Sequence, residues 1–380
     1  MQYNVLFLTL KIFSATGGIE KVCRIAGKAM YENCTRLQKR IGIMSMHDRQ
    51  EDAFDNPYFP SEIFSGLAAR KARFVLQAVR QGRQSKLVIL SHINLLVAGW
   101  LIKKISPCTR VVLLAHGIEV WGPLNRRQKM MLRCCDEIVS VSAFTSNKII
   151  AQQILPANKC RVLNNCLDPF LPLRKNVSVP QELYKKYSLE KGDQVLFTLS
   201  RLSATERYKG YDRVIDALVQ IGRPNIKYLL AGSYDTVEKK YLDEKIAANG
   251  LQQQVILAGF VPDEQLAAHF LLGDAYVMPS SKEGFGIVFI EAMYYGLPVV
   301  AGNADGSVDA LRNGELGLLV DPENVSEIRI AIQTLLEHPK LYVPETEKLM
   351  AHFSYDSYKI KLNELLERNR FEVMKKQAMR

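Results

Sequence analysis

The 380-residue sequence is poor in the features that mark secreted, zinc-binding and membrane-spanning proteins. Its seven cysteines are an odd number and include no Cys-x-x-Cys pair, so we expect neither a disulfide framework nor a zinc site. The first residues lack the basic segment and the long apolar core of a signal peptide. The most apolar run, residues 87–102, is shorter than a bilayer span and contains Ser91, His92 and Asn94, so it predicts a strand followed by a helix. These absences favour a protein of a reducing, cytoplasmic compartment.

Gly and Pro are not abundant, whereas 48% of the residues are hydrophobic and 23% are charged, as in a globular protein with ample core. A chain of this length exceeds what one core usually supports, so we expect two domains. Short apolar runs alternate with amphipathic helical stretches in both halves, which predicts parallel sheets covered by helices on both faces. The expected strands are residues 3–10, 41–46, 87–90, 111–115 and 137–141, then 194–200, 227–232, 255–258, 275–278, 298–301 and 317–320.

The predicted domains cover residues 1–170 and 190–350, and a charged amphipathic helix follows within residues 351–380. The segment 168–189 contains three prolines and is interpreted as a linker. Because ligands of such sheets bind beyond the carboxyl ends of the strands, we expect the chemistry at strand-to-helix turns.

The net charge of +11 is concentrated in the first half, where residues 1–180 carry 26 Lys and Arg against 11 Asp and Glu. The excess forms two clusters on helical stretches, namely Arg70, Lys71, Arg73, Arg80 and Arg83, and Arg126, Arg127, Lys129 and Arg133. A solvated helix face explains them most simply. Alternatively they attract an anionic membrane surface, where each basic residue contributes about 1 kcal/mol. Nucleic acid ranks third and is not expected as a partner, because no nucleic-acid-binding motif accompanies the charge.

The most informative segment is residues 281–302, in which Glu283 and Glu291 stand eight positions apart around a helix start near Gly286. Eight residues are a little over two helical turns, so both acids can flank one ligand. Gly284 and Gly286 leave backbone N–H groups uncovered at a helix N-terminus, where a phosphate is favoured. This pattern suits a nucleotide-sugar, and an ordinary loop-to-helix junction is the alternative.

Two strand ends of the first half carry further candidate ligand-binding residues. Gly17 and Gly18 open a helix, which fits either an anion site or a tight turn, without the fingerprint of a dinucleotide or ATP site. His116 follows an apolar strand and precedes a glycine. It can donate to a substrate hydroxyl or stabilise a charged sugar carbon, or it can simply be satisfied by backbone groups.

Strand ends of the second half add basic and small residues. Arg201 ends a buried strand and Lys209 follows eight residues later, before a glycine. A guanidinium fork and a lysine point charge together can clamp a diphosphate, and a surface lysine is the alternative for Lys209. The turn that contains Val261 can present backbone to a nucleobase or be a plain loop.

Taken in order, these motifs resemble glycosyltransferase family 4, whose members have the two-domain GT-B fold. The likeness covers nearly the whole chain and includes 165–168, where Cys166 replaces the family's usual glycine. The resemblance implies two Rossmann-like α/β/α domains facing across a cleft, with a C-terminal helix that can cross back to the first. It further implies a retaining glycosyltransferase that needs neither a metal nor a cofactor. The run 116–121 resembles bacterial exopolysaccharide mannosyltransferases, which favours GDP-mannose over a UDP-sugar.

The resemblance also implies roles for individual residues. Arg201 and Lys209 would hold the diphosphate, Glu283 would contact the donor sugar, and Glu291 the ribose. The backbone of Phe285, Gly286 and Ile287 would face sugar and phosphate, with Gly18 reaching the diphosphate from the other domain and His116 lying near the sugar.

The predicted function is therefore transfer of a sugar from a nucleoside-diphosphate sugar to a saccharide or polyprenyl-linked acceptor in cell-surface polysaccharide biosynthesis. The enzyme would be cytoplasmic, or peripheral at the inner face of the plasma membrane. Three alternatives stay open: a sugar-nucleotide epimerase of the same fold, a non-catalytic protein that binds anionic surfaces or nucleic acid, and, more weakly, an NAD-dependent oxidoreductase.

Overall fold

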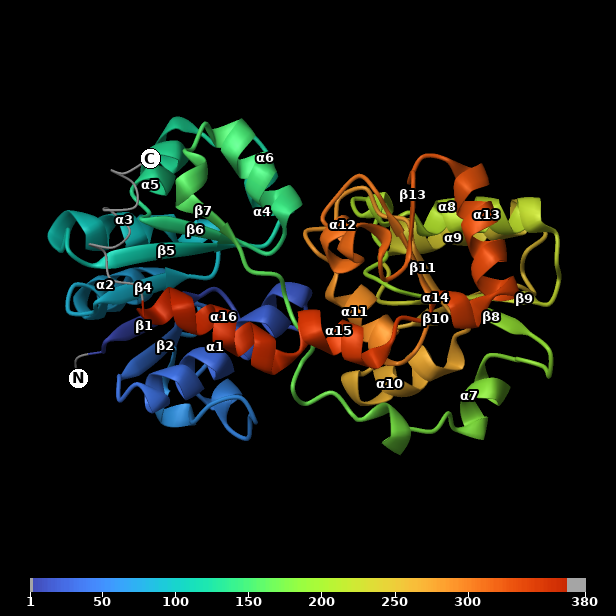
Figure 1. The fold of residues 1–380 in the computed structure, drawn as a ribbon, viewed down its shortest axis with the longest axis horizontal. Coiled ribbons are helices and arrows are strands. Elements are labelled where there is room, and N and C mark those ends of the chain that lie inside the picture. The colour runs from blue at the N-terminus through green and yellow to red at the C-terminus, as the bar shows by residue number, and fades with distance from the viewer. Residues whose placement is uncertain (1–2, 368–380) are drawn as a thin grey trace. The chain divides into compact units, whose positions relative to one another are not determined.

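The computed structural model describes residues 3–367, which divide into two compact units (Figure 1). The first contains residues up to Pro169 together with the segment from Ser354 onward, and the second contains Phe170–Phe353. No helix among the described residues combines the length and the apolar character needed to cross a bilayer.

The first unit is built on a seven-stranded parallel sheet in the order β3-β2-β1-β4-β5-β6-β7. Its strands are β1 (Val5–Thr9), β2 (Ile41–Ser45), β3 (Phe64–Gly66), β4 (Leu87–Leu90), β5 (Arg110–Ala115), β6 (Glu137–Ser140) and β7 (Cys160–Val162). Its helices are α1 (Gly18–Arg36), α2 (Lys71–Gly82), α3 (Leu96–Ile105), α4 (Ile118–Trp121), α5 (Arg126–Arg133), α6 (Ala143–Gln153) and α16 (Tyr355–Glu367). The five predicted strands are confirmed, whereas the edge strands β3 and β7 were missed because three residues make no apolar run.

Both faces of this sheet are buried, as the near-continuous apolar strands predict. Val5 and Phe7 of β1 point into one core, which α1 and α16 cover, and Leu6 and Leu8 point into the other, beneath α2 and α3. The run 87–102 is a strand followed by a helix, as predicted.

Helix α16 lies beside α1 although the two are more than 300 residues apart in the chain (Figure 1). It buries Tyr358, Leu362, Leu365 and Leu366, spaced as one helical face. Lys359 adds an ion pair to Glu32 at 3.0 Å. The predicted C-terminal helix is thus confirmed over 355–367 as a layer of the first unit, and its continuation over 368–380 lies outside the described residues.

The second unit holds a six-stranded parallel sheet in the order β10-β9-β8-β11-β12-β13. Its strands are β8 (Gln194–Leu199), β9 (Ile226–Ala231), β10 (Val255–Gly259), β11 (Ala275–Met278), β12 (Val299–Gly302) and β13 (Leu318–Val320), all six of which were predicted. Its helices are α7 (Gln181–Lys186), α8 (Tyr211–Ile221), α9 (Thr236–Ala248), α10 (Asp263–Leu272), α11 (Ile287–Tyr294), α12 (Ser307–Ala310), α13 (Val325–Glu337), α14 (Pro339–Tyr342) and α15 (Thr346–Phe353). The segment interpreted as a linker, 168–189, therefore includes a helix, α7.

Candidate active site

The loops after β8 and β11 meet at the carboxyl edge of the second sheet. These two strands are neighbours, and the remaining strands extend from them in opposite directions. The connections therefore diverge at this point, which is where open α/β sheets bind ligands. The backbone N–H of Ser281 donates to the carbonyl oxygen of Tyr208 at 2.8 Å and ties the two loops together.

Lys209 and Glu283 come from these two loops and form an ion pair. Their side chains are only 16% and 18% exposed. Burial by itself would lower the pKa of Lys209, but the attraction and hydrogen bond from Glu283 outweigh it and hold the pKa above its usual range. The interpretation of Lys209 as an ordinary surface lysine is therefore wrong. The lysine is held in its charged form at the carboxyl edge of the sheet.

Gly210 explains why a glycine follows Lys209. Its φ of +77° lies in the left-handed region, and a Cβ there would stand 2.3 Å from the carbonyl oxygen of Pro279. The short 3-10 turn η6 (Arg207–Lys209) can thus pass close to the end of β11 only when position 210 has no side chain.

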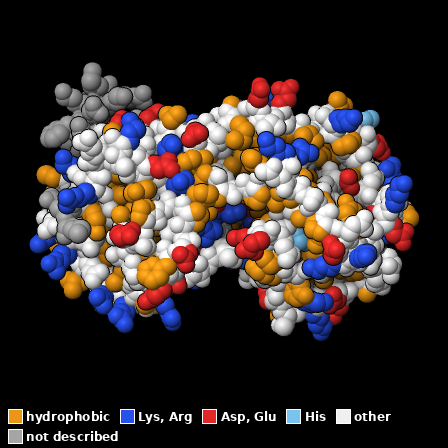
Figure 2. All heavy atoms as spheres, turned by 90° about the horizontal axis from the view of Figure 1, so that it is seen from below, with side chains coloured by type: hydrophobic (Ala, Val, Ile, Leu, Met, Phe, Trp, Pro, Cys, Tyr) orange, Lys and Arg blue, Asp and Glu red, His pale blue; other side chains and the backbone are white. Residues whose placement is uncertain are grey.

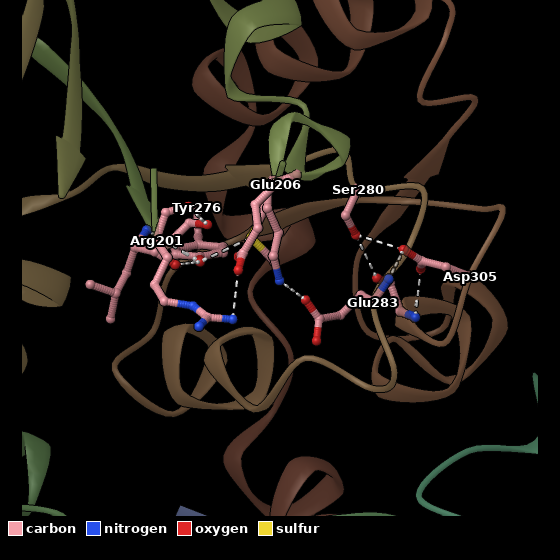
Figure 3. Close-up of polar contacts among 11 residues, drawn as sticks. Arg201, Glu206, Tyr276, Ser280, Glu283 and Asp305 are labelled. Carbon is pink, nitrogen blue, oxygen red and sulfur yellow. Dashed lines mark hydrogen bonds and ion pairs between the residues drawn. The ribbon is translucent and has the colours of Figure 1, made fainter. Parts of the chain in front are cut away.

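Arg201 extends from the end of β8 and is mostly exposed, with its guanidinium paired to Glu206 at 2.6 Å (Figure 3). Tyr208 lies among these groups, since charges on Arg201, Glu206, Lys209 and Glu283 all act on its phenol. Burial is the main cause that raises the Tyr208 pKa. Arg201, Lys209 and Glu283, which the sequence predicts as one site, are therefore brought together around a tyrosine that the sequence analysis missed.

Asp305 supports the Glu283 loop from behind, and the sequence analysis missed it (Figure 3). Its carboxylate accepts from the backbone N–H of Glu283 at 2.6 Å, from the hydroxyl of Ser280 at 2.8 Å and from the N–H of Ser307 at 2.9 Å. Burial raises the pKa of Asp305 to about 6, although these hydrogen bonds oppose the shift. In the sequence, the one feature that could have identified Asp305 is its place as an acidic residue in the loop after an apolar strand.

Helix α11 begins at Ile287 with Gly286 as its N-cap, so the helix start predicted near Gly286 is confirmed. Gly286 has a φ of +81°, and a Cβ there would lie 2.4 Å from the ring of Phe289. The side chains of Phe285 and Ile287 are buried, with Phe285 packed on Phe353 at a ring distance of 5.7 Å. A ligand at this helix end would therefore meet backbone rather than these side chains.

Glu291 and Val261 are both buried. Glu291 lies inside α11 and is 2% exposed. Burial raises the pKa of Tyr276 and of Tyr295, and the nearby Glu291 charge adds to both shifts. Val261 precedes α10 and is 4% exposed.

In the first unit, Gly17 and Gly18 open α1 after a loop that is fastened by a buried carboxylate. Asp48 accepts from the backbone N–H groups of Ile12 at 2.7 Å and of Ser14 at 2.7 Å, a role that the sequence analysis missed. The Glu20 carboxylate folds back over Gly17, where a Cβ would stand 2.2 Å from its oxygen. The start of α1 thus already faces an acidic group of its own helix.

His116 lies at the end of β5 and is 8% exposed. Its Nε2 lies 2.7 Å from the carbonyl oxygen of Ser91, so Nε2 carries the proton, and its backbone N–H donates to Glu119 at 2.6 Å. The other ring nitrogen, Nδ1, is buried with no hydrogen-bond partner within the described residues. The alternative of a histidine satisfied by backbone therefore applies to only one of its two nitrogens.

Cys166, which stands where the resembling family has glycine, does not adopt a left-handed backbone. Its side chain is buried in the core shared with α1 and α16, and burial raises the pKa of its thiol well above the usual value. Two residues later, Asp168 accepts from the hydroxyl of Tyr58 at 2.5 Å. Among residues 3–367, no three His, Cys, Asp or Glu side chains gather closely enough to hold a metal ion.

Comparison with known proteins finds a family model that is similar to the second unit. Residues 180–357 match the family model described as glycosyl transferases group 1. A GDP-mannose-dependent alpha-(1-6)-phosphatidylinositol monomannoside mannosyltransferase of Mycobacterium tuberculosis is 30% identical over 247 residues, which are 61% of this chain and 62% of that protein. The capsular polysaccharide biosynthesis glycosyltransferase CapM of Staphylococcus aureus is 27% identical over 56% of each chain. The chain thus spans somewhat less than two thirds of the mycobacterial relative.

Solved structures extend the likeness to nearly the whole chain. HepE of Anabaena, solved in complex with UDP, has a TM-score of 0.77 at 21% identity and covers 96% of this chain and 99% of its own. A glycosyltransferase of Rickettsia africae has a TM-score of 0.76 at 17% identity, over 98% and 99% of the two chains. At such identities the likeness establishes the fold. Residues 180–357 therefore resemble the group 1 glycosyl transferases, and the chain has the fold of the GT-B glycosyltransferases.

Proposed function

We propose that this chain transfers a hexosyl group from a nucleoside-diphosphate sugar to a saccharide acceptor. The observation that carries the proposal is the partly buried pair of Lys209 and Glu283 at the carboxyl edge of the second sheet, beside Arg201 and the start of α11. Cations and a helix N-terminus suit a diphosphate, and a carboxylate beside them suits sugar hydroxyls.

The chemical step depends on the negative charge that develops on the leaving diphosphate. When the bond between the sugar's anomeric carbon and the diphosphate breaks, negative charge grows on the leaving oxygen. Arg201 and Lys209, both in the loop after β8, would stabilise that charge as it develops. Binding the diphosphate would draw Lys209 away from Glu283 and free the carboxylate to accept from a sugar hydroxyl.

We further propose that the reaction retains the anomeric configuration and needs no metal or cofactor. In this scheme the acceptor oxygen forms the new bond on the face that the diphosphate leaves, and the acceptor's proton passes to the departing diphosphate oxygen. Atoms and charges then balance without a separate general base. Membership of family 4, which this scheme follows, stays a prediction.

Relatives point to two donors. The mycobacterial relative is named as dependent on GDP-mannose, whereas the Anabaena structures hold UDP and, in another crystal, UDP-glucose. Because the sequence relative has the higher identity, 30% against 21%, we propose GDP-mannose first and a UDP-sugar next. The same relative acts on a phosphatidylinositol monomannoside, and CapM serves capsular polysaccharide biosynthesis, which supports a lipid-linked acceptor in cell-surface polysaccharide assembly.

Thermal unfolding with GDP-mannose, UDP-glucose and ADP-glucose tests the donor site. A donor at about a hundred times its Kd adds about 2.7 kcal/mol of stability, or roughly 5–10 °C in Tm. Lys209→Ala should lose most of that shift, whereas Lys245→Ala, which breaks the ion pair to Asp216 elsewhere in the unit, should keep it. Absence of a shift with all three donors would refute the proposal. Donor incubated without acceptor separates transfer from epimerisation, since only an epimerase would change the sugar's configuration.

A further inference from the structure

Helix α2 carries two apolar faces, although one is enough to pack it on the sheet. Phe74, Ala78 and Gly82 are buried against the first unit. A second stripe, Ala72, Val75, Leu76 and Val79, has the spacing of a single helical face. Val75 and Val79 are partly buried and pack against the core beneath α2, whereas Ala72 and Leu76 are exposed. Leu76 is 71% exposed, although leucine ordinarily favours the interior.

The second stripe continues onto α3. Leu101 joins it to line an open groove of about 540 Å³ between the two helices. Val97 and Ile105 of α3 are 45% and 55% exposed, one helical turn to either side of Leu101. The α2–α3 face, defined as the groove together with Val97 and Ile105, is therefore a continuous apolar surface exposed to solvent.

The charge around the α2–α3 face has one sign. Residues 63–118 contain no Asp or Glu. Two of the basic residues in this stretch are neutralised, because Lys103 pairs with Asp136 and Arg110 with Glu137. The others are exposed and form no ion pair within the described residues: Arg70, Lys71, Arg73, Arg80, Arg83, Lys86 and Lys104. Figure 2 shows how Lys and Arg side chains gather along the left edge of the molecule, which belongs to the first unit.

We propose that the α2–α3 face docks on an anionic lipid bilayer. Aliphatic side chains such as Leu76 and Val97 can enter the boundary between headgroups and acyl chains, while the surrounding cations reach lipid phosphates. Nucleic acid would use the cations but offers no aliphatic surface to Leu76. The combination of exposed aliphatic groups with unopposed positive charge is therefore the complement of an anionic membrane.

Docking would bring the first unit to the surface where a lipid-linked acceptor resides. The inference nevertheless stands apart from the proposed transferase activity, because vesicle binding requires no turnover. Vesicle binding can therefore be refuted while the transferase activity is confirmed, and the reverse also holds.

Flotation with vesicles of phosphatidylcholine alone, or of phosphatidylcholine mixed with phosphatidylglycerol, tests the inference. We expect binding to the mixed vesicles that weakens as salt is raised. Leu76→Gln should weaken it roughly fivefold without a change in charge, whereas Leu341→Gln, at a site 78% exposed in the second unit, should not. Arg73→Gln with Arg80→Gln should weaken it about 25-fold, at roughly fivefold per charge. The control for the loss of charge is Lys240→Gln in the second unit, at a side chain that is 78% exposed, and it should leave vesicle binding unchanged.

Three outcomes would overturn the inference. The first is equal binding, or none, to both kinds of vesicle. The second is binding of single-stranded RNA, without vesicle binding, that falls in the arginine variant but not in Leu76→Gln. The third is a dimer in solution that Leu76→Gln dissociates, which would assign the face to a second copy of the chain.

Discussion

The carboxylate of Asp305 accepts a hydrogen bond from the backbone N–H of Glu283 at 2.6 Å. The loop after β12 thereby holds the loop after β11, which carries the carboxylate paired with Lys209. The candidate site thus depends on a buried acid that would not itself touch a substrate.

Asp305 should make the stability of the protein depend on pH. Its pKa is about 6 in the folded chain against about 3.9 for an unperturbed Asp, so between these values the folded state binds more protons than the unfolded state. The contribution of Asp305 to the free energy of unfolding therefore falls as pH rises from about 4 to 6, by at most about 3 kcal/mol. Urea unfolding of wild type and Asp305→Asn across this range should show wild type losing stability relative to the variant. A constant difference would contradict the assignment.

Lys209→Ala should reduce sugar transfer by orders of magnitude while the protein stays folded. Loss of one desolvated ionic contact typically costs about 2–5 kcal/mol, and Glu283 at 18% exposure can be solvated when its partner is removed. Glu283→Ala should have a comparable effect. Transfer rates with saturating donor measure it, and circular dichroism confirms the fold. Near-normal turnover in both variants would remove these residues from the active site.

Gly210→Ala should destabilise the protein by at least about 2–3 kcal/mol, because left-handed backbone strain adds to a clash with the Pro279 carbonyl. Gly222 is the matched control, with a similar φ of +65° but no atom within 4 Å of a Cβ. Gly222→Ala should therefore cost only about 1 kcal/mol. Equal costs in urea unfolding would show that the close approach to β11 does not constrain position 210.

Arg207→Gln should destabilise the second unit by about 2–3 kcal/mol. The guanidinium of Arg207 donates through Nε to Glu238, which is fully buried and also accepts from the hydroxyl of Tyr211 at 2.8 Å. Loss of Arg207 leaves a buried carboxylate without its cation. Arg223→Gln breaks an exposed pair with Glu337 and should change stability by less than about 0.5 kcal/mol. Similar values for the two variants would show that solvent reaches Glu238.

Much of the second sheet was predictable because each of its strands is a near-continuous apolar run. The helix start at Gly286 was predictable for a local reason, since a glycine precedes an uninterrupted helical stretch. By contrast, β3 and β7 were not predictable, because their few residues pair only at sheet edges and carry no apolar pattern. The role of Asp48 was equally hidden, because its partners Ile12 and Ser14 lie more than thirty residues earlier.

By itself, the sequence determined that both halves form parallel α/β sheets, that Arg201, Lys209 and Glu283 follow strands of the second half, and that positive charge gathers in the first half. These properties follow from residue type and spacing along the chain, which act locally. Only the tertiary structure decided that Lys209 pairs with Glu283, that Asp305 supports the Glu283 loop, and that α2 and α3 join two weak apolar stripes into one exposed face. Each of these depends on strand order and helix packing, which place residues far apart in sequence within contact distance.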